Sequence, residues 1–171
     1  MNEIQAVKTA KIEEVKKNSK KGFTLVELVV VIAILAILAA IAIPVVSSTI
    51  QSSQRSSALS NAQTLELALK EAHAQIVAGD HTVYAKVGDD VATLDNVKVS
   101  TVRSAKAIKM TDTVKIGSDT YNLMWSKTDS KCYYVTTKDS KSVGLDTSVT
   151  LPADATTEIN DDVTLATLFN K

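Results

Sequence analysis

Few residues in this chain could carry out chemistry. Its 171 residues include one cysteine, Cys132, and two histidines, His73 and His81. A single cysteine excludes an intrachain disulfide and a cysteine-based zinc site, and two isolated histidines are expected at the surface rather than on a metal. Serines and threonines are plentiful but lack a partnered base, and no glycine-rich phosphate loop is present. We therefore expect no catalytic residue, no metal and no cofactor, and hence a protein that is not an enzyme.

One carboxylate stands in an unusual place. Glu27 lies near the start of the stretch 23–46, in which 16 consecutive apolar residues run from Leu28 to Ile43. As a helix this stretch is roughly 36 Å long, enough to cross a hydrocarbon core of about 30 Å. An ionised carboxylate inside such a segment costs about 2.5–3.5 kcal/mol on insertion scales, so Glu27 is a candidate functional residue.

The stretch 23–46 allows three interpretations from its residues alone. It could be a secretory signal cut near Ala40-Ile41-Ala42, a permanent single-span anchor, or a buried core helix. The six lysines among residues 1–22 and the length of the stretch make the core helix the least favoured. Those lysines are expected to stay in the cytoplasm, so the rest of the chain is directed outward.

The residues from Lys20 to Leu28, KKGFTLVEL, resemble the class III signal sequence of type IV pilins and pseudopilins. The shared pattern is a basic stretch, glycine at the cut, phenylalanine as the new first residue and glutamate fifth after the cut. Pro44 lies where many such pilins carry a helix proline. The resemblance covers about residues 16–78, and the absence of a C-terminal disulfide points to a Gram-positive, clostridial source.

This resemblance implies a sequence of events. Prepilin peptidase would cut between Gly22 and Phe23, and the new amino group of Phe23 would be methylated. The subunit would wait in the cytoplasmic membrane and then be assembled by the pilus machinery into an extracellular helical filament of its own copies. Glu27 would pair with the ammonium of Phe23, from the same chain or a neighbour, and so select the correct docking position.

The periodicity predicts that the helix continues far beyond the membrane. Residues 47–60 contain seven serines but no glycine or proline, and apolar residues then recur at spacings of three and four. We expect one helix from Phe23 to Ala78, with a kink at Pro44, an ion pair between Glu66 and Lys70, and an exit at Gly79-Asp80. The recurring apolar positions that should face a globular head are Ala58, Ala62, Leu65, Leu69, Ala72 and Ile76.

The pattern changes after residue 80. The stretches 119–127 and 131–138, joined by a turn at 128–130, predict a β-hairpin whose inner face carries Tyr121, Leu123 and Trp125. Further expectations are a strand or turn at 113–116, a weak helix within 91–107, an irregular segment at 139–160 with a turn near Pro152, and a short terminal helix at 161–169 capped by Asn160 or Asp161.

The fold class is therefore α+β, a long N-terminal helix with a small antiparallel sheet packed on its C-terminal half in the shape of a lollipop. We divide the chain into a cleaved basic leader at 1–22, a transmembrane and filament-core helix at 23–54, and a globular head at 55–171. Without a disulfide the C-terminal segment is expected to be held by packing alone, and Cys132 to be a small buried hydrophobe.

Charge is segregated along the head. Residues 98–115 carry a net charge of +4 and residues 142–170 a net charge of −5, while the whole chain has a net charge of zero. The balance argues against nucleic acid as the primary ligand. The segregation allows two solvated surfaces or, alternatively, complementary patches that meet between neighbouring subunits.

These observations favour a type IV pilin, a structural subunit of a surface filament used for adhesion, aggregation or motility. One alternative is a pseudopilin of a type II secretion or competence system. Another is a membrane-anchored binding protein with a single span.

Overall fold

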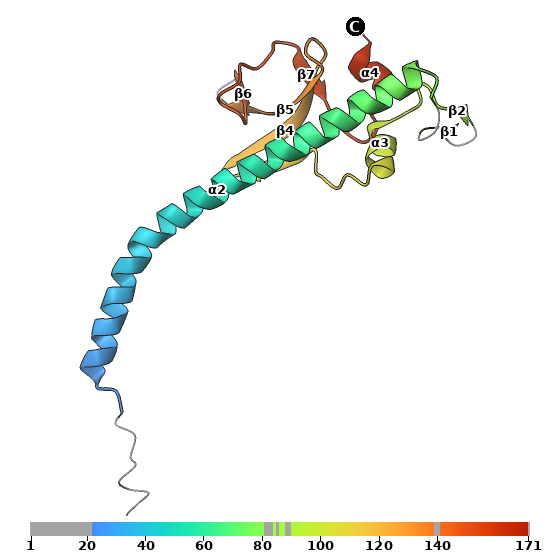
Figure 1. Cartoon of the computed structure of the whole chain (residues 1–171). Helices are drawn as coiled ribbons and strands as arrows, with labels where there is room; N and C mark the ends of the chain where they lie inside the picture. The colour runs from blue at the N-terminus through green and yellow to red at the C-terminus, as the bar shows by residue number, and fades with distance from the viewer. Residues whose placement is uncertain (1–21, 81–83, 85, 88–89, 139–140, 171) are drawn as a thin grey trace, which may run out of the picture. The chain divides into compact units, whose positions relative to one another are not determined.

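The computed structural model describes residues 22–80, 84, 86–87, 90–138 and 141–170. The chain forms two compact units, Met1–Val46 and Ser47–Lys171, and the elements are labelled in Figure 1. Helix α2 runs from Leu25 to Val77 and contributes residues to both units. The functional division predicted at residues 54 and 55 thus lies inside the second compact unit, which begins at Ser47.

Helix α2 is 53 residues long and passes through Pro44 without interruption. The predicted helix from Phe23 to Ala78 is confirmed to within two residues at each end. At the C-terminal end the amide of Gly79 donates to the carbonyl of Ile76 at 3.1 Å, and the amide of Asp80 donates to Gln75 at 2.9 Å. This pair of bonds is a Schellman cap, and it needs glycine because Gly79 has a φ of 74°.

The head contains a five-stranded antiparallel sheet. Its strands are β3 (Thr113–Ile116), β4 (Asp119–Ser126), β5 (Lys131–Lys138), β6 (Lys141–Gly144) and β7 (Ala155–Glu158). The order is β3-β4-β5-β6, and β7 pairs with β4. The predicted hairpin is confirmed as β4 and β5, with Leu123 opposite Tyr134 and Trp125 opposite Cys132. A separate two-stranded sheet joins β1 (Lys86–Val87) to β2 (Asp90–Val91).

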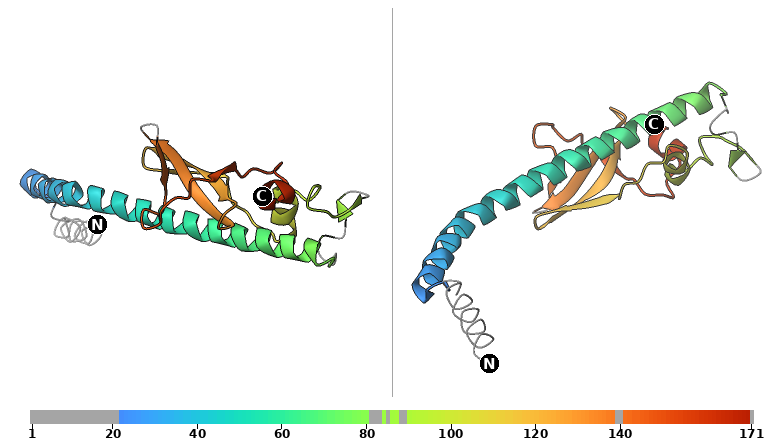
Figure 2. Two further views of the ribbon diagram at one scale, coloured as in Figure 1. Left: turned by 90° about the horizontal axis from the view of Figure 1, so that it is seen from above. Right: turned by 60° about the horizontal axis from the view of Figure 1, so that its bottom comes forward.

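The core of the head lies between the second half of α2 and the inner face of the sheet. Trp125 and Leu123 of β4 are fully buried there, and Leu65 and Leu69 of α2 have no exposed surface. The two layers lie side by side in both views of Figure 2. Four alanines complete the buried face of α2, and their small side chains let the sheet approach the helix closely: Ala58, Ala62, Ala68 and Ala72.

Two short helices differ from the predictions. The weak helix predicted within 91–107 is reduced to α3 (Val99–Ala105), because the residues before it form turns and the end of β2. The terminal helix α4 (Leu165–Phe169) starts later than predicted, and its N-cap is Thr164 rather than Asn160 or Asp161. The hydroxyl of Thr164 accepts the amide of Thr167 at 3.4 Å.

The prediction of an irregular segment at 139–160 is wrong, since this segment contains β6 and β7. Both strands are only four residues long, and β7 has the sequence ATTE. Neither carries the alternating apolar pattern of a half-buried strand. Each is instead defined by the strand beside it: β6 pairs with β5, and β7 continues past the end of β3 on the same edge of β4.

The expectation that packing alone holds the C-terminal segment is also wrong. The indole N–H of Trp125 donates to the carbonyl of Leu168 at 2.8 Å in a buried hydrogen bond. The ammonium of Lys127 donates to the carbonyl of Asn170 at 2.8 Å. These bonds tie the end of the chain to β4 and the turn after it, 43 residues away in sequence.

A second set of polar contacts fixes the chain before β7. The Asp154 carboxylate accepts the hydroxyl of Ser126 at 2.8 Å and the amide of Thr128 at 2.7 Å. Asp129, on the same turn, accepts the hydroxyl of Tyr133 and shares the single hydroxyl proton of Ser126 with Asp154. The hydrogen bonds from Thr128 and Ser126 hold the pKa of Asp154 below its ordinary value. Burial opposes the ionisation of Asp129, but its hydrogen bonds outweigh burial and lower the pKa.

Candidate functional site

The candidate cleavage site lies just before the first turn of α2. Gly22, Phe23 and Thr24 are not helical, and α2 begins at Leu25. A Cβ added at Gly22 would meet nothing within 4 Å among the described residues, and the side chain of Phe23 is exposed. The bond between Gly22 and Phe23 therefore lies outside the helix, between two exposed residues that a protease could reach.

Glu27 caps the N-terminus of α2. Its Oε2 accepts the amide N–H of Thr24 at 2.8 Å and the hydroxyl of Thr24 at 2.8 Å, while its own amide donates to the Thr24 hydroxyl oxygen at 3.3 Å. This reciprocal arrangement is a capping box. Sequence reasoning had missed it, although the spacing T-x-x-E at 24–27 is its usual signal. No partner of Oε1 occurs among the described residues, so that oxygen is available to a further donor.

The side chains in the apolar part of α2 are exposed in the described structure. Every residue from Leu25 to Val46 is exposed, including the leucines, isoleucines and valines. By length and composition α2 could cross a membrane, and its most apolar stretch is exposed. Pro44 lies within this exposed helix, and the predicted kink there remains a prediction. Lipid or another molecule could therefore give this segment hydrophobic stabilisation.

Two other residues that were considered for chemistry, His73 and Cys132, pack against other residues of the head. The ring of His73 stacks on Phe169 with 4.2 Å between ring centroids, and burial lowers the pKa of His73. Cys132 is half-buried against the core, and burial raises the pKa of its thiol, so it remains a protonated, apolar group. His81 lies outside the described residues. Among those that are described, no three His, Cys, Asp or Glu side chains converge as a metal site would require.

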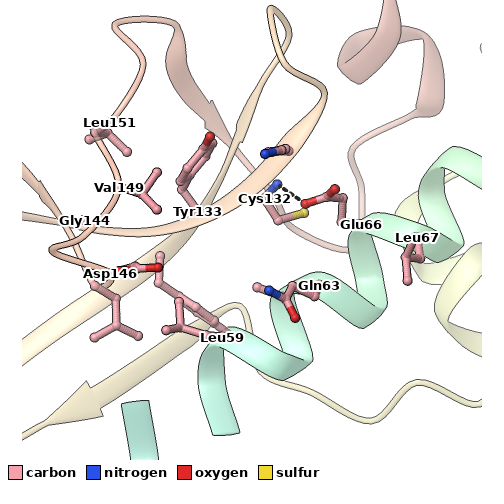
Figure 3. Close-up of a pocket in the computed structure, with 14 residues that line it drawn as sticks. Leu59, Gln63, Glu66, Leu67, Cys132, Tyr133, Gly144, Asp146, Val149 and Leu151 are labelled. Carbon is pink, nitrogen blue, oxygen red and sulfur yellow. Dashed lines mark hydrogen bonds between the residues drawn. The ribbon is translucent and has the colours of Figure 1, made fainter. Parts of the chain in front are cut away.

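Sequence reasoning also missed a groove of about 430 Å³ between α2, β5 and residues 144–151. Figure 3 shows Leu59, Gln63 and Glu66 of α2 on one side and Val149 and Leu151 on the other.

The Glu66 carboxylate joins α2 to β5 at this groove. It pairs with Lys70 at 2.6 Å, as the sequence predicted, and it accepts the backbone amide of Cys132 at 3.3 Å. Strand β6 pairs with residues 135–138 of β5 and does not reach Cys132. At Cys132 the carboxylate of Glu66 therefore accepts the amide that a neighbouring strand would otherwise accept. Glu66 therefore protects the unpaired edge of β5.

Some of the opposite charges of the head meet inside one chain. Lys98 pairs with Asp162 at 2.9 Å, and Arg103 pairs with Asp161 at 2.9 Å and also with Asp112. Arg103 is buried, so these contacts neutralise a cation inside the head. These residues already have partners within the chain, so they do not support the alternative of complementary patches between subunits.

Comparison with known proteins identifies the N-terminal segment. Residues 17–43 match the family model described as the prokaryotic N-terminal methylation motif. No curated protein and no solved structure matches the chain. The match includes Gly22, Phe23 and Glu27, and it supports a prepilin of the type IV pilin or pseudopilin type, cut by prepilin peptidase and anchored in the membrane as a precursor. The long helix followed by a small antiparallel sheet has the α+β fold expected of such a protein.

Proposed function

We propose that the chain is the structural subunit of a type IV pilus filament that serves adhesion, aggregation or surface motility. One observation carries the proposal: the apolar side chains of Leu25–Val46 are exposed, while the head has a complete core of its own. Burying a leucine, isoleucine or valine side chain is worth about 1.5–3 kcal/mol, so this segment has a large unused capacity for association. Lipid covers it in the precursor, and neighbouring copies cover it in the filament.

Glu27 gives this association its register. No lysine or arginine occurs between Phe23 and Gln54, so a Glu27 carboxylate packed among apolar helices lacks a side-chain cation. Cleavage after Gly22 creates an ammonium on Phe23, four residues before Glu27 in the same chain or within reach in a neighbour. The free Oε1 of Glu27 can accept it while Oε2 keeps the cap on Thr24. A wrongly offset subunit would bury both charges unpaired, at a cost of several kcal/mol.

The test compares Glu27→Ala with Thr24→Ala, each expressed as the only copy of this subunit. Glu27→Ala removes both the cap and the proposed pairing. Thr24→Ala removes the hydroxyl contacts of the cap but leaves the carboxylate, which can still accept the backbone amide of residue 24. We expect both variants to be inserted and cut, with the amount of sheared filament falling at least about tenfold for Glu27→Ala only, equivalent to about 1.4 kcal/mol. Glu27→Asp should give intermediate amounts, because the charge remains but the reach is shorter.

Filament yield is measured against mature membrane-bound subunit, with mass spectrometry to confirm the N-terminus at methylated Phe23. Wild-type yield from Glu27→Ala would refute the pairing. An equal defect in Thr24→Ala would assign the role of Glu27 to the helix cap. Loss of secretion or DNA uptake in a deletion strain that never had surface filaments would identify a pseudopilin instead.

A further inference from the structure

One end of the sheet lies against the part of α2 that follows its apolar segment. A Cβ added at Gly117, in the turn between β3 and β4, would lie 3.6 Å from the side chain of Gln51. The end of β5 and the start of β6, where Lys138 is opposite Lys141, lie at the same end, because Lys138 contacts Asp119, the first residue of β4. Gln51 follows Val46 by five residues, or about 7.5 Å along the helix. We call this end of the sheet, with Arg55 of α2, the anchor-proximal end.

Cations gather at the anchor-proximal end. Lys115, Lys138 and Lys141 are exposed on the strands, and Arg55 is half-buried on α2 one turn beyond Gln51. Asp119 is the one described carboxylate at this end, and it pairs with Lys138 at 3.5 Å. Within the described part of the chain, the other three cations have no carboxylate at ion-pair distance. The described groups here therefore carry a net charge of +3, and the sequence adds Asp139, which lies outside the described residues.

Elsewhere in the head many cations are neutralised locally. Lys70 is paired with Glu66, and Lys106 pairs with Glu71 at 2.7 Å, while Lys98 and Arg103 are paired as described above. The anchor-proximal end thus differs from the ion-paired regions of the same head. Its unpaired cations lie at the end of the head next to Gln51. Residues 47–54, which connect the apolar segment to Arg55, carry no charge.

Resting on the proposed function, we propose that the anchor-proximal end binds the phosphate groups of anionic phospholipids while the subunit waits in the membrane. Residues 23–46 are long enough to fill the hydrocarbon core, so the residues that follow emerge among the headgroups. The distance of Gln51 beyond Val46 is within the Debye length of about 8–10 Å at physiological salt. Each lysine or arginine near an anionic surface strengthens binding about fivefold, and the effect is weakened by salt.

The test uses the full chain in phosphatidylcholine vesicles with and without phosphatidylglycerol. A fluorophore is attached to Ser118→Cys in a Cys132→Ala background, and a lipid with a nitroxide on its headgroup serves as the quencher. Ser118 is exposed in the turn between β3 and β4, so quenching reports how closely this end approaches the headgroups. We expect quenching to be at least about threefold stronger in anionic vesicles and to decrease with added salt.

A double variant and a matched control make the test specific. Lys115→Gln/Lys141→Gln should lower the quenching in anionic vesicles to the level found in neutral ones. Lys109→Gln/Lys131→Gln removes two exposed lysines that also have no described carboxylate partner but lie elsewhere, and it should leave quenching unchanged. Equal quenching in both lipids, or an equal loss in the control, would overturn the proposal.

Two further readouts distinguish the lipid contact from the proposed filament function and from a contact with a second copy of the chain. Cleavage at Gly22 and methylation of Phe23, followed by mass spectrometry, test the proposed function independently of the lipid contact. If Lys115→Gln/Lys141→Gln kept full quenching but lost filament yield, the partner of this end would be a second copy of the chain, and the lipid proposal would be wrong.

Discussion

The two parts of α2 share one secondary structure and have opposite burial. In Leu25–Val46, Leu35 and Leu38 are both more than half exposed, whereas Leu65 and Leu69, in the part after Ser47, are completely buried. The more apolar part is thus the exposed one. Its branched side chains cover the whole circumference of the helix, so no single face is suited to a sheet. The second part has a stripe of alanines and leucines on one side and polar residues on the other.

This contrast shows that hydrophobicity and burial within the chain are separate properties. A stripe one face wide can be covered by the head of the same chain, and a helix that is apolar all round needs partners on every side. The second part of α2 therefore stabilises the head, and under the proposed function the first part associates with lipid and with other copies.

Truncation tests the division most directly. A chain that begins at Ser47 should be soluble and fold cooperatively, because it keeps the whole buried stripe and the contact between Gln51 and the turn at Gly117. A chain that begins at Val77 should not fold, because it loses Leu65 and Leu69 from the core. Thermal melting followed by circular dichroism measures both. A cooperative transition in the shorter chain would show that the stripe is not part of the core.

A matched pair of leucine substitutions compares the two parts in the full chain. Leu69→Ala should lower the free energy of unfolding by about 2–5 kcal/mol, because it leaves a cavity in the core. Leu35→Ala should leave the stability of the head unchanged and reduce filament yield instead. Urea unfolding in detergent and filament shearing give the two readouts. Similar effects of both substitutions on unfolding would contradict the division of α2.

Acid should weaken the attachment of the C-terminal segment to the sheet. The pKa of Asp154 is lower in the folded chain than its ordinary value of 3.8, so its contribution to stability is present above about pH 4. That contribution is lost as the pH falls through the folded pKa, because the unfolded chain then binds more protons. Asp154→Asn should be less stable than wild type at pH 7, and the difference should shrink at pH 3. A difference that is independent of pH would assign the effect to packing.

The features that could be predicted from the sequence are those that depend on residues close together in the chain. The apolar run, the stripe after Ser56 and the Gly79 exit are patterns within a few helical turns, so α2 could be predicted almost to its ends. The hairpin of β4 and β5 was predictable for the same reason, since its strands alternate and its turn is short. The residues proposed for cleavage and assembly, Gly22, Phe23 and Glu27, were identified through a local motif, which the family match also covers.

Contacts and strand pairings between residues far apart in the sequence became known only from the tertiary structure. Glu66 reaches the amide of Cys132 across 66 positions of sequence, and Arg103 finds Asp161 across 58. Strands β6 and β7 are too short and too polar to be recognised alone, and the strands beside them supply the hydrogen bonds that define them. Side-chain type shows that a charge needs a partner, but the choice among many carboxylates depends on which elements the core brings together. A local pattern contains no information about that choice.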